Sequence, residues 1–188
     1  MDAKNFPAEL DKKLRQVRQL IRRDMPRIVG VEAVEHFTDN FRRGGFLNGG
    51  LQRWQDVKRR DRASKWYGFE YKAERRTYYA FNRDKMTGKT YKAKEQKRLN
   101  YSETATTRKV LTSKRNYLMN SFGYRAEAGK TTVYNDAPHA QIHNEGGTFK
   151  VFGKATATMP KRQIIGHSKE LNKKIENELL RQLDRIFK

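Results

Sequence analysis

A chain of 188 residues, 36% hydrophobic and 34% charged, is long enough for one domain with a modest core and exposed arms, and this composition argues against a compact enzyme. The absence of cysteine excludes disulfide bonds and thiolate metal sites, and no apolar run approaches the ~20 residues of a membrane span. The net charge of +21 points to a partner with dense negative charge: DNA, RNA or an acidic protein surface.

An amphipathic helix is predicted over residues 7–23. Its apolar face follows the 3.6-residue period: Leu10, Leu14, Val17 and Ile21. Its other face is basic: Lys12, Lys13, Arg15, Arg18 and Arg22. That basic face is either solvated or turned toward phosphates or a partner. We expect Asp24-Met25-Pro26 to end the helix, because proline cannot continue the hydrogen-bond ladder. Residues 1–24 thus form an N-terminal helix, without the apolar core of a secretion signal.

A single domain is predicted over residues 25–188. It begins with a helix from about Val31 to Arg43, whose phenylalanines face the core and which Gly44-Gly45 ends. Residues 44–65 resemble a loop, and Trp54 in it either packs back onto the domain or anchors a neighbouring subunit.

Aromatic residues alternate with polar and basic ones over residues 66–103. Residues 51–100 hold 16 basic and 6 acidic residues, about half of the net charge. This composition suits a nucleic-acid stacking surface or a short β-ribbon with lysine-blunted edges. We interpret residues 60–105 as a basic aromatic insertion.

The second half predicts the rest of an α+β fold. A helix is expected within residues 104–120, a hairpin from Phe122 to Asn135, and a last helix capped by Ser168. We predict a small antiparallel sheet with the Val31 and Ser168 helices packed on one face, plus an extended hairpin or arm over residues 148–158.

The most informative stretch is Pro138–Gly166. It predicts one turn of helix, a Gly-Gly stop, an extended arm that leaves the core, and a proline-led turn that docks the last helix. We treat its residues as motif and interface candidates: Pro138, His139, His143, Gly146, Gly147, Phe149, Phe152, Pro160, Arg162 and Gly166. Arg162 can hold a carboxylate within the subunit or across an interface.

Only His139, His143 and Glu145 suggest chemistry. Two histidines four residues apart on a helix could share a metal, but the zincin pattern needs a glutamate directly after the first, where Ala140 stands. We expect instead that one histidine packs or hydrogen-bonds at the helix end. No phosphate loop or nucleophile turn is present, so we expect no enzyme, cofactor, metal or small-molecule substrate.

The blocks PHAQIHNEGG and MPKRQIIG resemble the phage virion morphogenesis family, the tail completion (neck) proteins of Mu-like tailed phages. His139 stands where the family usually has an aromatic residue, Gln163 where it often has proline, and Ile165 where it has leucine. The resemblance covers about residues 25–187 with a gap at 60–105.

The resemblance implies a non-enzymatic virion structural protein of the neck or tail, assembled in the host cytoplasm. It would act in tail completion and head–tail joining as a ring, sixfold as in related neck proteins, beside other neck or tail proteins and with DNA possible in the channel. The alternative is a basic nucleic-acid-binding protein that uses non-specific phosphate contacts and aromatic stacking. A membrane partner is not expected.

Overall fold

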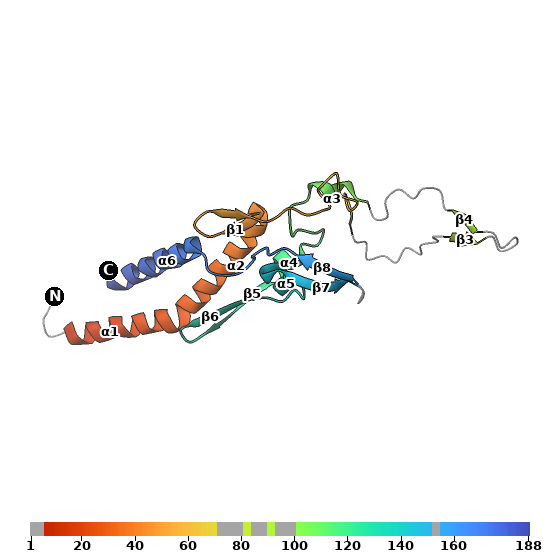
Figure 1. Cartoon of the computed structure of the whole chain (residues 1–188). Helices are drawn as coiled ribbons and strands as arrows, with labels where there is room; N and C mark the ends of the chain where they lie inside the picture. Colours follow the sequence, from red (N-terminus) through yellow and green to blue (C-terminus); the bar gives the residue numbers. More distant parts are fainter. Residues whose placement is uncertain (1–5, 71–80, 84–89, 93–100, 152–154) are drawn as a thin grey trace. The chain divides into compact units, whose positions relative to one another are not determined.

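The computed structural model describes residues 6–70, 81–83, 90–92, 101–151 and 155–188, which divide into two compact units (Figure 1). The first unit comprises residues 1–55 and 109–188, and the second residues 56–108. The first unit's helices are α1 (Phe6–Gln19), the π-helical turn η1 (Leu20–Asp24), α2 (Met25–Arg43), α4 (Tyr117–Asn120), α5 (Ala140–Glu145) and α6 (Lys169–Phe187). Its strands are β1 (Gly45–Leu47), β2 (Leu51–Arg53), β5 (Phe122–Glu127), β6 (Lys130–Asn135), β7 (Gly147–Val151) and β8 (Ala155–Met159). The second unit holds β3 (Phe81–Arg83), β4 (Thr90–Lys92) and α3 (Glu103–Thr107).

The α+β prediction is confirmed. Within the described residues the strands pair as four antiparallel hairpins of two strands each: β1–β2, β3–β4, β5–β6 and β7–β8. The predicted hairpin over residues 122–135 is β5–β6. No described helix combines the length and apolar character needed to cross a bilayer.

The prediction that the first helix ends at Pro26 is wrong. The backbone stays helical from α1 through η1 into α2, with Pro26 in the first turn of α2. Pro26 has no N–H to donate to the carbonyl of Arg22, four residues earlier. That carbonyl accepts instead from the N–H of Gly129, in the turn between β5 and β6 (3.2 Å). The Thr131 hydroxyl also donates to the Pro26 carbonyl (2.7 Å), so the hairpin tip satisfies the backbone at the junction.

Helix α2 is the centre of the first unit, where it contacts β5, β6, β1 and α6. The core has buried members from α2, β1 and α6, and partly buried residues of other elements pack against it: Ala33, Phe37, Phe46 and Leu171, with Phe122, Val133, Ile165 and Ile175. Gly30 allows the helix to approach the hairpin, since a Cβ there would lie 2.1 Å from the Tyr124 ring. The α2 and α6 helices therefore share one core with β5–β6.

The segment after α2 is more ordered than a loop, because it forms the β1–β2 hairpin. Gly44 ends α2 in the left-handed conformation, as predicted, and its N–H donates to the Asn40 carbonyl (2.9 Å). Trp54 is 8% exposed and stands edge-on to Phe41, with ring centroids 5.1 Å apart. Its indole N–H donates to the Gln163 carbonyl (2.8 Å). Of the two interpretations of Trp54, the structure shows packing onto its own unit.

The helix expected within residues 104–120 is present only as two short pieces and does not run from Leu111 to Leu118. Only α3 and α4 are helical, and Leu111 and Asn116 between them have φ of +59° and +47°, a conformation that no α-helix includes. Hydroxyl side chains compete for the local carbonyls here. Thr106 donates to the Glu103 carbonyl (2.7 Å), and Thr112 to the Lys109 carbonyl (2.7 Å).

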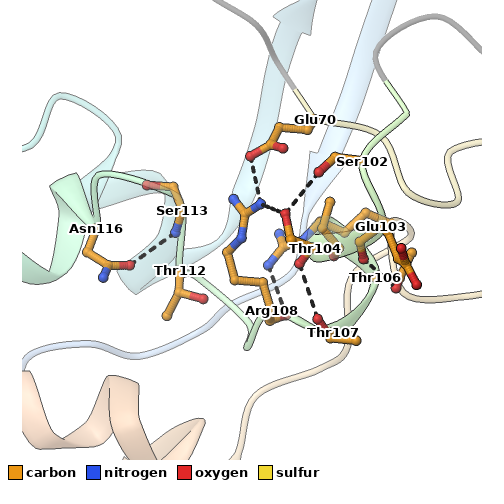
Figure 2. A network of polar contacts seen from close by, with 12 residues as sticks. Glu70, Ser102, Glu103, Thr104, Thr106, Thr107, Arg108, Thr112, Ser113 and Asn116 are labelled. Atoms are coloured by element: carbon orange, nitrogen blue, oxygen red, sulfur yellow. Dashed lines mark hydrogen bonds and ion pairs between the residues drawn. The ribbon is translucent and has the colours of Figure 1, made fainter.

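The second unit contains polar contacts around Arg108, which Figure 2 shows. Arg108 forms an ion pair with Glu70 (2.6 Å) and also donates to the Thr104 hydroxyl. Phe69 and Tyr101 form a single β-bridge. The insertion predicted at about 60–105 falls within this unit.

Candidate assembly site around α5 and the β7–β8 arm

The site is built on the end of α5. Gly146 ends this helix as predicted, donating its N–H to the Ile142 carbonyl (3.0 Å) with φ +73°. A Cβ on Gly146 would lie 2.8 Å from the backbone nitrogen of Lys161. Glycine is therefore required here for both its backbone angles and its size. The segment Pro160–Gly166, which we call the docking turn, can pass close to the helix end only because position 146 has no side chain.

Arg162 fastens the docking turn to the unit. Its backbone N–H donates to the His143 carbonyl (2.7 Å), and its side-chain Nε donates to the Gln55 carbonyl (2.9 Å). One terminal nitrogen lies 3.4 Å from the Met159 sulfur. The residue is 5% exposed. Both of these side-chain contacts lie within the subunit, and that Arg162 holds a carboxylate stays a prediction.

Asn144 is a second fastening, which the sequence analysis missed. Its side-chain oxygen accepts from the backbone N–H groups of both Ile164 (2.9 Å) and Ile165 (3.0 Å). Ile164 is fully buried and both hydrogen bonds are partly buried, so these donors have little access to water. The available signal was a polar side chain in the last turn before Gly146-Gly147, where an amide can cap a neighbouring segment.

The two histidines of α5 have different surroundings. His139 is exposed, and its ring centroid lies 6.1 Å from that of Tyr117 and 5.6 Å from that of His143. The buried Nδ1 of His143 has no hydrogen-bond partner among the residues that the structure describes. Burial, then the charges of His139 and Arg162, lower the pKa of His143 to about 4, so its imidazole is neutral at pH 7. His143 therefore packs at the helix end, as predicted.

In the described parts of the chain, no three histidine, cysteine, aspartate or glutamate side chains gather closely enough to hold a metal ion. The His139–His143 pair thus has no third ligand among them.

The β7–β8 hairpin, which we call the arm, connects α5 to the docking turn. Its strands pair in register from Gly147 with Met159 to Val151 with Ala155, and among described residues they pair only with each other. Phe149 on the arm is 38% exposed. The predicted candidate Phe152 lies outside the described residues. The arm therefore presents an unpaired strand edge and an aromatic side chain.

The structure brings three of the predicted residues together: His143, Gly146 and Arg162 meet where the docking turn crosses the end of α5. Pro138 and His139 precede α5 and are exposed. Gly147 (φ +128°) begins the arm, and the half-buried Pro160 and Gly166 (φ +153°) bound the docking turn. Gly146 and Arg162 thus hold the docking turn against the end of α5.

A comparison with protein families matches residues 71–184 to the phage virion morphogenesis family, more than half of the chain. The chain belongs to this family. The matched range contains the whole of α5, the arm and the docking turn, and it also includes residues 71–105, for which the sequence analysis found no family counterpart. No curated protein and no solved structure matches the chain. The resemblance drawn from the two short blocks is therefore confirmed, and the family implies a structural role in building the phage particle.

Proposed function

We propose that this protein is a non-enzymatic subunit that completes the phage tail and joins it to the head by assembling into a ring at the neck. The resemblance of the sequence to tail completion proteins makes a sixfold ring the expected form. Neighbouring neck or tail proteins would be its partners. The excess positive charge would face DNA in the channel or acidic surfaces of adjoining rings.

The observation that supports this proposal is the way the arm is fixed at its base and open along its length. Gly146, Asn144 and Arg162 hold both ends of the arm against buried parts of the unit. The arm itself offers an unpaired edge and the exposed Phe149 ring. A strand edge held in a fixed direction can pair with a neighbouring chain at a low entropy cost.

The test is assembly in the presence of neck partners. Mass photometry of the chain with neighbouring neck proteins should show a closed ring, and deleting residues 149–158 should abolish it. Phe149→Ser should weaken ring formation, whereas Tyr134→Ser on β6 should not, because Tyr134 has the same 38% exposure but lies on another hairpin. A particle that stays monomeric under every condition, or rings that form without the arm, would count against the proposal.

The second unit favours one alternative, non-specific nucleic-acid binding. Trp66 is 44% exposed, and the Lys65 ammonium lies 5.9 Å from its ring centroid. Residues 56–108 carry 16 basic and 7 acidic residues. DNA titrations at several salt concentrations separate the two functions. Useful affinity at physiological salt with a steep salt slope favours nucleic-acid binding, while binding that vanishes near ~0.15 M salt favours the structural role.

A further inference from the structure

Helix α1 carries an apolar stripe that the described part of the chain leaves uncovered. No residue of α1 is buried. The exposed fractions are 44% for Leu10, 45% for Leu14 and 51% for Ile21, which begins η1, and Val17 between them is only half-buried. An amphipathic helix of a soluble protein normally buries such a stripe. The stripe therefore has no cover among the described residues.

Helix α6 covers only the side of α1 next to the stripe. The Lys13 ammonium donates to the Phe187 carbonyl (3.3 Å) and lies 5.5 Å from the Phe187 ring centroid. Leu20 follows Lys13 by seven residues and therefore lies on the same side of the helix, and it is 5% exposed. The opposite flank of the stripe is formed by Asp11 and Arg18, also seven residues apart. The stripe thus lies between a side that α6 occupies and a flank with one charge of each sign.

The spacing of the stripe is that of a two-helix seam. Leu10, Leu14, Val17 and Ile21 are separated by four, three and four residues, the alternation of the apolar a and d positions that is typical of coiled-coil packing. A second α1 running antiparallel would place Leu14 against Val17 and Leu10 against Ile21, each twice by symmetry. The two helices would then form four successive layers of apolar contacts, with no polar residue in any of them.

The flanking charges select the orientation of that second helix. In the antiparallel register Asp11 of each copy faces Arg18 of the other, which gives two attractive pairs. In a parallel pair Lys13 of each copy would face Arg18 of the other, which gives two repulsive pairs. The charge pattern therefore complements a second copy of the same helix in one direction only.

We propose that α1 is a homotypic contact site at which two copies of this chain pair antiparallel. The contact is two-fold and self-complementary, unlike the head-to-tail contact that closes a ring, so it does not depend on the proposed function. Each copy carries a net charge of +21, and salt screens that repulsion but leaves the apolar layers intact. Pairing should therefore tighten as salt rises, whereas association bridged by nucleic acid would weaken.

The first experiment is sedimentation of the nuclease-treated full chain without neck partners. The wild-type chain should dimerise, and Leu14→Asp should be monomeric with unchanged helix content. The matched control Val31→Asp, at a residue that is 53% exposed on α2, should dimerise like the wild type. A monomeric wild-type chain at all concentrations, or a dimeric Leu14→Asp variant, would overturn the proposal.

Charge exchange tests the register. Asp11→Arg should weaken the dimer about tenfold, since two attractive exposed pairs become repulsive. Adding Arg18→Asp to the same chain should restore it, because the two charges have only changed places. Loss of affinity in the double variant comparable to that in the single variant would overturn the antiparallel register.

Cysteine cross-linking tests the orientation directly, because the natural chain has no cysteine. Leu14→Cys and Val17→Cys chains should form a mixed disulfide with each other but not with themselves. A Leu14→Cys homodisulfide would indicate a parallel pair and refute the proposal. Ring formation with neck proteins, measured on Leu14→Asp in parallel, reports separately on the proposed function.

Discussion

Replacement of Gly146 by alanine tests whether the arm is fixed by the fit at its base. Gly146 has φ +73° and ψ −170°, a region that is essentially restricted to glycine, so a side chain there costs about 1–3 kcal/mol in backbone strain. The new Cβ would also stand 2.8 Å from the Lys161 nitrogen and 3.1 Å from the Met159 carbonyl oxygen. These are backbone atoms, so the docking turn must shift and its bond from Arg162 to His143 must weaken. We expect Gly146→Ala to lower the free energy of unfolding by about 3 kcal/mol.

The matched control is Gly44→Ala. Gly44 has the same φ of +73°, but its ψ of +32° is the ordinary left-handed conformation, and a Cβ there would meet no atom within 4 Å. Its substitution should cost only about 1 kcal/mol. Urea denaturation of the wild type and both variants measures the difference. Equal losses for Gly44→Ala and Gly146→Ala would show that the close approach of the docking turn contributes nothing, and the reasoning would be refuted.

Three further predictions concern residues that contact the docking turn. Trp54→Phe should cost about 1–3 kcal/mol because it leaves a buried carbonyl without its donor, whereas Trp66→Phe at an exposed position should be near neutral by urea denaturation. Asn144→Leu should cost about 2–4 kcal/mol because two backbone N–H groups lose their acceptor, and Asn144→Asp, which keeps the oxygen, should recover most of that loss in the same assay. Burial lowers the pKa of His143 to about 4 from the ordinary 6.5, so the contribution of its neutral imidazole to stability is fully present above pH 6.5 and is lost as the pH falls toward 4. His143→Leu should therefore flatten the curve of unfolding free energy against pH between these values. An unchanged slope in that variant would contradict the assignment.

Local signals in the sequence were sufficient where the structure is decided by neighbouring residues. Ser168 caps the last helix, its hydroxyl oxygen accepting from the Leu171 N–H (3.2 Å). Gly44 and Gly146 end their helices as their positions predicted. The β5–β6 hairpin likewise follows from alternation and a turn over adjacent residues. In each case the partners are close in the chain, so the pattern and the contact coincide.

Two of the failures occur where the deciding partner is distant in sequence. Pro26 did not end the first helix because the hairpin tip supplies an N–H, from Gly129, to the carbonyl that proline leaves unpaired. The hydrogen bonds of the Asn144 side chain could not be predicted, because its partners lie twenty residues further along the chain. The prediction of a helix through Leu111 failed for a local reason. A leucine seldom adopts positive φ, and no residue pattern here predicts that conformation. The candidate site could thus be located from its motifs, but not the contacts that hold it.

The distribution of apolar side chains favours a role of this fold in contacts with other subunits. With 36% hydrophobic residues the chain has few to spare, yet the residues of the α1 stripe and Phe149 on the arm stay exposed. Meanwhile the docking turn uses a buried arginine, an amide and backbone groups to fix the direction of the arm. In a monomeric protein, polar fastening of an exposed strand edge adds only its own stability, about 0.5–1.5 kcal/mol for each hydrogen bond. A subunit of a larger particle gains more, since each surface that is fixed before assembly reduces the entropy lost when neighbours pair.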